Sequence, residues 1–274
     1  MPPTARSAAR RADESRRSGA ESSRKLLRLL VSFDEQHHTQ TVSELAKRAD
    51  IPVSSAYRFL SVLRDEKLVE EAERGSYRLS LRMVALGRAA TAAVSNLLRA
   101  ARPVLEQIAA SSGETTLLIR RSGFSAVCSD RVESLHPVRL QFDPGTPMSL
   151  HAGSAARILL AALPRTERYA YYAQIGLPRP GHLGDAELDA LARVGWAESF
   201  EEVDAGIWGV SALVTAESAS MNGSSSDTVA AIGVAGPLFR LDADRRAEVI
   251  EMVRDGARTV SMNLRRQRVC EAAS

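Results

Sequence analysis

The stretch from Thr41 to Leu79 limits the possible folds most, because two helix signals, a turn signal and a hairpin signal follow one another within it. Thr41 and Glu44 have the spacing of a capping box, in which each side chain bonds an amide of the first helical turn. Residues 50–51 predict a turn after this helix. Pro52 then suits the first turn of the next helix, where its missing N–H costs nothing. The residues expected to face inward from the capped helix are Leu45, Ala46 and Ala49.

The helix that follows Pro52, from Val53 to about Lys67, has two faces of different chemistry. One face is apolar at helical spacing and is expected to pack inward; it consists of Val53, Ala56, Leu60 and Leu63. The other face carries hydroxyls, a phenol and a guanidinium, which are donors that can reach phosphates and base edges of DNA. Its residues are Ser54, Ser55, Arg58 and Ser61, with Tyr57 beside them. A merely solvated face is the alternative interpretation.

A β-hairpin is predicted after this helix. Residues 68–70 and 77–79 have the composition of strands, and the turn between them contains Gly75. Helix, turn, helix and hairpin in this order are the pattern of a winged helix-turn-helix, which places one helix in the major groove of double-stranded DNA. Arg74 at the hairpin tip is expected to contact the DNA backbone beside that groove. The candidate DNA-binding residues are therefore Thr41, Ser54, Ser55, Tyr57, Arg58, Arg74 and Ser76.

Charge is distributed unevenly along the chain. Residues 1–88 hold 17 Lys and Arg against 12 Asp and Glu, a net +5, whereas the remainder holds 19 against 21, a net −2. A basic N-terminal part on a neutral body favours a polyanion as its partner. Residues 1–21 have almost no large apolar side chain and are expected to be a disordered basic tail, either without a role or as an arm that contacts phosphates. A further helix is expected from Ser23 to Phe33, capped by Ser22 or Ser23.

Several classes of protein are disfavoured by what the sequence lacks. Two cysteines are too few for a disulfide framework and have no metal-ligand spacing, which fits a reducing cytosol. The chain has neither an apolar run of about 18 residues nor a signal-peptide pattern, so a cytoplasmic protein without a membrane partner is expected. It also lacks a paired nucleophile and base, so no catalytic residue, metal or cofactor is expected.

The part of the chain after the hairpin mixes helices and strands. Residues 81–100 have the pattern of one linker helix or two, and another helix is expected from Arg102 to Ser112, ended by Gly113. Antiparallel hairpins between helices predict an α+β domain. Its strands are predicted at residues 115–120, 125–131, 207–215 and 228–235, its loops at 144–150 and 217–227, and its helices at 152–163 and from 240 to about 267. The expected organisation is a tail at 1–21, a DNA-binding domain at 22–82, a linker helix at 83–100 and a second domain at 101–270.

Six segments together resemble the IclR-type bacterial transcriptional regulators, with a match from about residue 22 to 268. They are Ser22–Leu30, Leu45–Leu60, Gly113–Thr115, Asp130–Ser134, Leu150–Ala155 and Ile232–Pro237. The resemblance implies a C-terminal effector-binding domain of GAF-like α/β type with a central antiparallel sheet. It also implies homodimers, often paired into tetramers, and control by a small molecule, often an organic or aromatic acid. Asp50 stands where the family usually has glycine, and aspartate tolerates the left-handed conformation that such a turn needs.

The resemblance further implies where the effector binds, between the central sheet and the loop that leads into the 152–163 helix. A helix N-terminus there would favour an anion. The matching positions are Met148, Leu150, Ser154, Ala155, Gly209, Ser211, Gly233 and Ala235. Some relatives have polar residues or cysteine where this chain has Gly209, Gly233 and Ala235, which implies more room, fewer polar contacts and a bulkier, aromatic effector.

The implied function is a ligand-responsive transcriptional regulator that represses a catabolic operon. It would bind a roughly palindromic operator as a homodimer or a dimer of dimers, and would sense a small organic or aromatic acid. Two alternatives stay open, a DNA-binding protein that needs no ligand and an enzyme built on the C-terminal domain. His151 close to Ser154 could suggest nucleophilic chemistry, but the motif contains no partnered acid, which favours helix capping or pocket lining instead.

Overall fold

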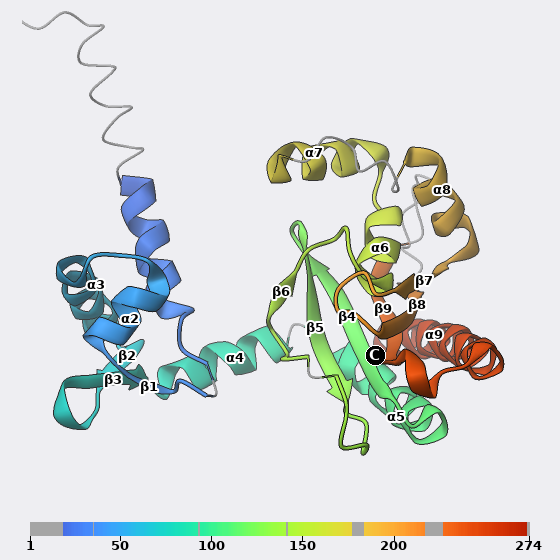
Figure 1. Cartoon of the computed structure of the whole chain (residues 1–274), viewed down its shortest axis with the longest axis horizontal. Coiled ribbons are helices and arrows are strands. Elements are labelled where there is room, and N and C mark those ends of the chain that lie inside the picture. The colour runs from blue at the N-terminus through green and yellow to red at the C-terminus, as the bar shows by residue number, and fades with distance from the viewer. Residues whose placement is uncertain are drawn as a thin grey trace, which may run out of the picture. The chain divides into compact units, whose positions relative to one another are not determined.

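The structure of the chain is a computed structural model that describes residues 19–34, 36–92, 94–140, 142–176, 184–216 and 227–272. The chain divides into two compact units, Met1–Ala93 and Val94–Ser274, which are described separately (Figure 1). Among the described residues, no helix combines the length and apolar character needed to cross a membrane. The expected basic tail falls mostly on residues 1–18 and the expected mobile loop on residues 217–226, both outside the described residues.

The first unit is a helical domain with a small antiparallel sheet. The elements are a helix over residues 19–30, β1 (Thr39–Thr41), α2 (Val42–Ala49), α3 (Val53–Asp65), β2 (Val69–Glu71), β3 (Ser76–Leu79) and α4 (Arg82–Ala92). A 3₁₀ turn over Glu73–Gly75 joins β2 to β3. The sheet order is β1-β3-β2, so the predicted hairpin carries a third strand that the sequence analysis did not predict. The winged helix-turn-helix is confirmed.

The local signals between the two helices are confirmed. The Thr41 side chain accepts from the Glu44 amide, and the Glu44 side chain accepts from the Thr41 amide, which closes the predicted capping box. Asp50 lies at the end of α2 in the left-handed region, with φ 53°. The turn therefore forms without the usual glycine. Pro52 lies one position before α3, at its N-cap.

Two details of this unit differ from the sequence analysis. Val53, expected to face the core, is 45% exposed, and Phe59 is buried instead, together with the expected Ala56, Leu60 and Leu63. The inward face of α3 is thus rotated from the one inferred, because its packing against the rest of the domain, and not periodicity alone, selects which apolar residues are covered. The first helix already includes residues 19–21, so Ser22 and Ser23 lie inside it and do not cap it. The Ser23 hydroxyl donates to the Gly19 carbonyl one turn back.

The second unit is an antiparallel sheet between two layers of helices. Its strands are β4 (Thr115–Ser122), β5 (Ser125–Val132), β6 (Pro147–Met148), β7 (Trp196–Phe200), β8 (Ile207–Ala216) and β9 (Asp227–Pro237). Its helices are α5 (Ser95–Ser112), α6 (Ser154–Ala161), α7 (Arg165–Ile175), α8 (Asp185–Val194) and α9 (Ala243–Ala272). The sheet order is β6-β5-β4-β9-β8-β7. The predicted α+β class with a central antiparallel sheet is confirmed.

Alternating residues of each strand divide the core of this unit in two. Trp208, Val210, Ile232 and Val234 pack against α5 and α9 on one face of the sheet. Small residues of the same strands, among them Ala231 and Ala235, face the opposite layer of α6, α7 and α8 (Figure 1). This second face is the one that carries the expected effector-binding positions on β8 and β9.

Some elements depart from those expected. Helix α5 begins at Ser95 and runs through Pro103, so residues 95–100 continue into the helix that was expected to begin at Arg102. Helices α4 and α5 are separate, so residues 81–100 form parts of two helices and not one linker helix. Helices α7 and α8 and strand β7 were not predicted, and the expected 144–150 loop contains the short β6 paired with β5.

Candidate functional sites

The outer face of α3 carries the donor residues that the sequence analysis selected. Ser54, Arg58 and Ser61 are exposed, Tyr57 is 58% exposed, and Ser55 is half-buried. The guanidinium of Arg58 lies 5.4 Å from the ring centre of the buried Phe59, a cation–π contact, and among the described residues its nitrogens make no hydrogen bond or ion pair. The two faces of α3 therefore separate core residues from donors as the hypothesis requires.

The N-terminus of α3 has no side-chain cap. Pro52 occupies the N-cap position, and its carbonyl accepts from the amides of Ser55 and Ala56 at 2.9 and 3.0 Å. The amides of Val53 and Ser54 have no hydrogen-bond partner within the described part of the chain. The first turn also contains no acidic residue. Free amides and the positive end of the helix dipole together suit a phosphate oxygen.

The remaining candidate DNA-binding residues are placed differently. The Thr41 hydroxyl donates to Glu44 at 2.8 Å as part of the capping box, and the Ser76 hydroxyl donates to the Glu73 carbonyl at 2.6 Å. Both hydroxyl protons are thus used inside the domain. The backbone of Arg74 lies in the 3₁₀ turn at the hairpin tip, where Gly75 takes φ 71°.

Two other arginines, one on the hairpin and one at the end of α3, are paired with glutamates of β2. Arg78 on β3 donates to Glu70 on β2 at 2.7 Å, and Arg64 at the end of α3 lies 3.7 Å from Glu71. Both pairs are about half exposed, so each contributes little to stability. Because these carboxylates already neutralise the arginines, α3 is the stronger candidate for the main anionic contact.

A cavity of about 170 Å³ lies between the sheet and the start of α6. Seven of the eight effector-binding candidates line it: Met148, Ser154, Ala155, Gly209, Ser211, Gly233 and Ala235. Its other walls include Leu117, Ile119, Leu140, Phe142, Val203 and Ile207, so most of the lining is apolar. The lining contains two carboxylates, Glu202 and Asp204, and no lysine, arginine or histidine.

Three serine hydroxyls meet at the floor of this cavity. The Ser154 hydroxyl lies 2.9 Å from the Ser211 hydroxyl, and the Ser154 amide donates to the Ser199 hydroxyl at 3.1 Å. Ser199 pairs with Gly209 across β7 and β8, and Ser211 pairs with Gly233 across β8 and β9. The cluster thus joins α6 to two adjacent strands, β7 and β8.

The two glycines make room for these hydroxyls and not for the cavity. A Cβ at Gly233 would lie 2.3 Å from the Ser211 hydroxyl and 2.8 Å from the Val210 carbonyl. A Cβ at Gly209 would lie 3.2 Å from the hydroxyls of both Ser154 and Ser199. The inference that small side chains here imply a bulkier effector therefore needs correction, because serines of the same domain fill the space.

The N-terminus of α6 is partly occupied by an acidic side chain of the chain itself. The Gly153 amide donates to Glu202 at 3.0 Å, and Arg157 pairs with the other oxygen of the same carboxylate. After the Ser154 amide, which donates to Ser199, the amides of Ala155 and Ala156 have no partner among the described residues, and both residues line the cavity. Glu202 belongs to the β7–β8 loop, which the sequence analysis missed because no local pattern places a loop over a distant helix.

Leu150, the eighth candidate, lies in the core and not on the cavity wall. Its side chain is fully buried, and its amide donates to the Tyr171 hydroxyl at 3.0 Å. The same hydroxyl lies 2.7 Å from Nδ1 of His151. Burial raises the pKa of Tyr171 above its ordinary value. His151 therefore links the loop before α6 to α7 and forms neither a helix cap nor part of the cavity lining.

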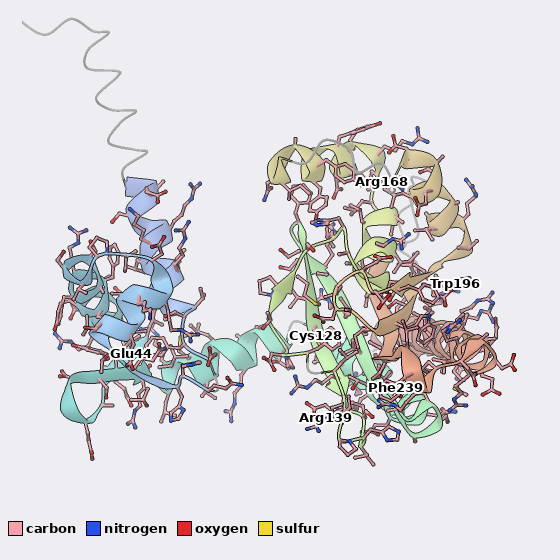
Figure 2. The ribbon with its side chains drawn as sticks, in the orientation of Figure 1. Glu44, Cys128, Arg139, Arg168, Trp196 and Phe239 are labelled. Atoms are coloured by element: carbon pink, nitrogen blue, oxygen red, sulfur yellow. The ribbon has the colours of Figure 1, made fainter. Side chains whose placement is uncertain are left out.

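Other chemistry-bearing residues occupy structural positions. Cys128 lies on β5 (Figure 2). Its side chain is 1% exposed, and this burial raises the pKa of the thiol to about 11, which keeps it protonated at neutral pH. His37 hydrogen-bonds Asp34 at 2.8 Å, and its hydrogen bonds hold the pKa of Asp34 down to about 2. Within the described ranges, no group of His, Cys, Asp or Glu has the arrangement of a metal site.

Comparison with known proteins agrees with this geometry. The family described as "Bacterial transcriptional regulator IclR C-terminal" matches residues 89–262, and the "IclR helix-turn-helix domain" matches residues 22–73. The chain is 28% identical over 254 residues to the HTH-type transcriptional repressor AllR of Escherichia coli K12, covering 90% of this chain and 91% of AllR. It is also 28% identical to the HTH-type transcriptional regulator KipR of Bacillus subtilis, over 82% of this chain and 89% of KipR.

A solved structure shows the same fold. It is an IclR homologue from Microbacterium hydrocarbonoxydans complexed with 4-hydroxybenzoate, with 23% identity and a TM-score of 0.69 over 89% of this chain and 99% of that one. The family matches span both units and include α3 in the first and the strands that line the cavity in the second. The chain therefore belongs to the IclR family of bacterial transcriptional regulators.

Proposed function

We propose that this chain is a cytoplasmic, non-enzymatic repressor of a catabolic operon, which binds operator DNA through α3 and senses a small organic acid in the cavity beside α6. Residues 22–82 form its DNA-binding domain, 83–100 its linker and 101–270 its effector-binding domain. The repressor assignment is supported by the similarity to AllR. The observation that carries the DNA-binding role is the donor-bearing outer face of α3 with its uncapped N-terminus.

The proposed DNA contacts come mainly from the first half of α3. Ser54, Tyr57 and Arg58 face outward there and reach base edges, while the free amides of the first turn hold a phosphate. Backbone contacts are assigned to Ser55 and to Arg74 at the hairpin tip. Thr41 and Ser76 contact the DNA backbone by exchanging the hydrogen bonds that their hydroxyls make inside the domain. A symmetric dimer presents two copies of α3 to successive major grooves, so the operator is roughly palindromic. Affinity falls steeply with salt because phosphate neutralisation releases counterions.

Replacement of Arg58 by alanine tests this surface. The exposed guanidinium makes no ion pair among the described residues, so Arg58→Ala should leave the melting temperature near that of the wild type. Operator affinity should fall by about fivefold or more, since a bidentate arginine contact contributes roughly 1–3 kcal/mol. Fluorescence anisotropy at one fixed salt concentration measures the effect. Unchanged affinity would remove α3 from the proposed interface.

The effector we propose is a small carboxylate with one ring. A cavity of about 170 Å³ is close to the roughly 150 Å³ of an apolar protein cavity that accepts benzene. Apolar walls suit a ring, and the free amides of Ala155 and Ala156 suit a carboxylate. The Microbacterium relative, which has 4-hydroxybenzoate bound, supports the same class.

A cavity-filling variant tests the effector site independently of DNA. Ala235→Leu adds three carbons to the cavity wall and should abolish binding of monocyclic acids such as benzoate in isothermal titration calorimetry. The same variant should retain operator affinity, whereas Arg58→Ala should retain acid binding and lose DNA. Equal acid binding by Ala235→Leu and wild type would contradict this placement of the effector.

Effector and operator must influence each other for the protein to act as a sensor. Such coupling requires that the acid bind one of two states of the dimer more tightly, and it acts equally in both directions. Acid affinity measured with and without bound operator should therefore differ by the same factor as operator affinity measured with and without acid.

A further inference from the structure

Two exposed apolar side chains lie in the first half of α3. Val53 is 45% exposed and Tyr57 is 58% exposed. They are four residues apart on one helix, so they lie next to each other on its surface. Neither helix stability nor core packing accounts for Val53, because a β-branched residue is a poor helix former and nearly half of this side chain is uncovered.

The surroundings of this pair point to an anionic partner. Ser54 and Arg58 occupy the same two turns, the first turn holds no acidic residue, and the amides of Val53 and Ser54 have no partner among the described residues. An apolar patch meant for another protein surface would not need, beside it, amides and a guanidinium that have no hydrogen-bond or salt-bridge partner in the described part of the chain. Duplex DNA provides anionic phosphates, and its major groove exposes one apolar group on the base edges, the 5-methyl of thymine.

We propose that Val53, with the ring of Tyr57 beside it, contacts the 5-methyl group of a thymine in each half of the operator. This inference rests on the proposed function and adds to it the base that this end of α3 selects. The first helical residue and the one a turn later are those that a recognition helix brings deepest into the major groove. Ser54 and Arg58 supply the hydrogen bonds, and the apolar pair distinguishes thymine from cytosine by its methyl group.

The test removes the methyl group without disturbing base pairing. A binding site is first selected from random duplexes with the full-length chain, and each thymine of one half-site is then replaced by deoxyuridine. Removing one buried methyl should weaken wild-type binding about fourfold at one thymine, because a methyl-sized group contributes about that factor. In Val53→Ala most of this preference should disappear at that position, because only the Tyr57 ring then remains beside the methyl group. This variant raises helix propensity, so folding is preserved.

Val62 provides the matched control. It lies on the same helix and is also 45% exposed, but it is nine residues, or roughly 13 Å, further from the N-terminus. Val62→Ala should keep the fourfold preference for thymine. Equal wild-type binding to every deoxyuridine probe would overturn the inference, as would a Val53→Ala protein that keeps the preference. Failure to select any duplex would instead contradict the proposed function, and this inference with it.

Discussion

Replacing Arg240 by methionine should destabilise the second unit by about 3 kcal/mol. Arg240 donates from two nitrogens to the two carboxylate oxygens of Glu114, each at 2.7 Å. The Glu114 side chain is 3% exposed and that of Arg240 is 19% exposed. A Cβ at Gly236 would lie 2.7 Å from the same carboxylate, so this side of the pair is closely packed. Loss of one partner of such a buried pair costs roughly 3–5 kcal/mol, and the partial exposure of Arg240 favours the lower figure.

Tryptophan fluorescence can follow this effect selectively. Both tryptophans of the chain, Trp196 and Trp208, belong to the second unit, and Trp208 is fully buried. For a unit of this size, a loss of about 3 kcal/mol corresponds to a lowering of the melting temperature by roughly 6–12 °C. Wild type and variant must be compared at one protein concentration, because association would also shift the transition.

An exposed ion pair in the same unit supplies the control. Arg258 lies 2.8 Å from Asp255, with side chains 62% and 69% exposed, so Arg258→Met should change the melting temperature little. Addition of Glu114→Gln to Arg240→Met should recover part of the loss, because the uncompensated charge is gone. If Arg240→Met has the same melting temperature as Arg258→Met and wild type, the reasoning that the buried Glu114 charge needs Arg240 for its stability is refuted.

Two further predictions concern the pKa of a buried thiol and the charge beside the cavity. The folded pKa of Cys128, about 11, exceeds its ordinary value of 9.0, so its contribution to stability is complete below pH 9 and is lost as pH rises towards 11. Urea unfolding should accordingly show a shallower alkaline loss of stability in Cys128→Ala than in wild type; parallel curves would contradict this. Glu202→Gln keeps an acceptor for Gly153 but removes the negative charge next to the free amides of α6, so it should raise the affinity for a monocyclic acid about fivefold, or ~1 kcal/mol. Asp204→Asn is the control, because it also removes a carboxylate from the cavity, and among the described residues Asp204 makes no hydrogen bond or ion pair with α6. An equal gain in acid affinity in Asp204→Asn would show that the overall negative charge of the cavity, and not the position of Glu202, is responsible.

Features set by neighbouring residues could be predicted from the sequence. The capping box of Thr41 and Glu44 and the left-handed Asp50 depend on contacts within a few residues, and the structure has all of them. Strand β1 could not be predicted, because three residues carry no alternation and its partner β3 is far along the chain. The burial of Phe59 in place of Val53 depends on how α3 packs, which the spacing of apolar residues leaves undetermined.

The cavity shows the same limit. The resemblance selected positions on β8 and β9 that do face one cavity. The resemblance placed Leu150 at this cavity as well. In the structure the Leu150 side chain is buried in the core, and its amide donates to the Tyr171 hydroxyl. The serine cluster that explains Gly209 and Gly233 depends on pairing between strands and on α6, so no single segment of sequence contains it.

The N-terminus of α3 has no side-chain cap, and at Pro52 the stability of the domain and its affinity for the operator have opposite requirements. A missing side-chain cap costs a helix about 1 kcal/mol, and a serine in place of Pro52 could supply one. That serine could accept from the amide of Ser54, one of the two amides that we assign to a DNA phosphate, so the domain would resist unfolding better while its affinity for the operator fell. Selection of variants for thermal stability alone would therefore lower operator affinity. Such a trade-off between stability and function is common at ligand-binding sites.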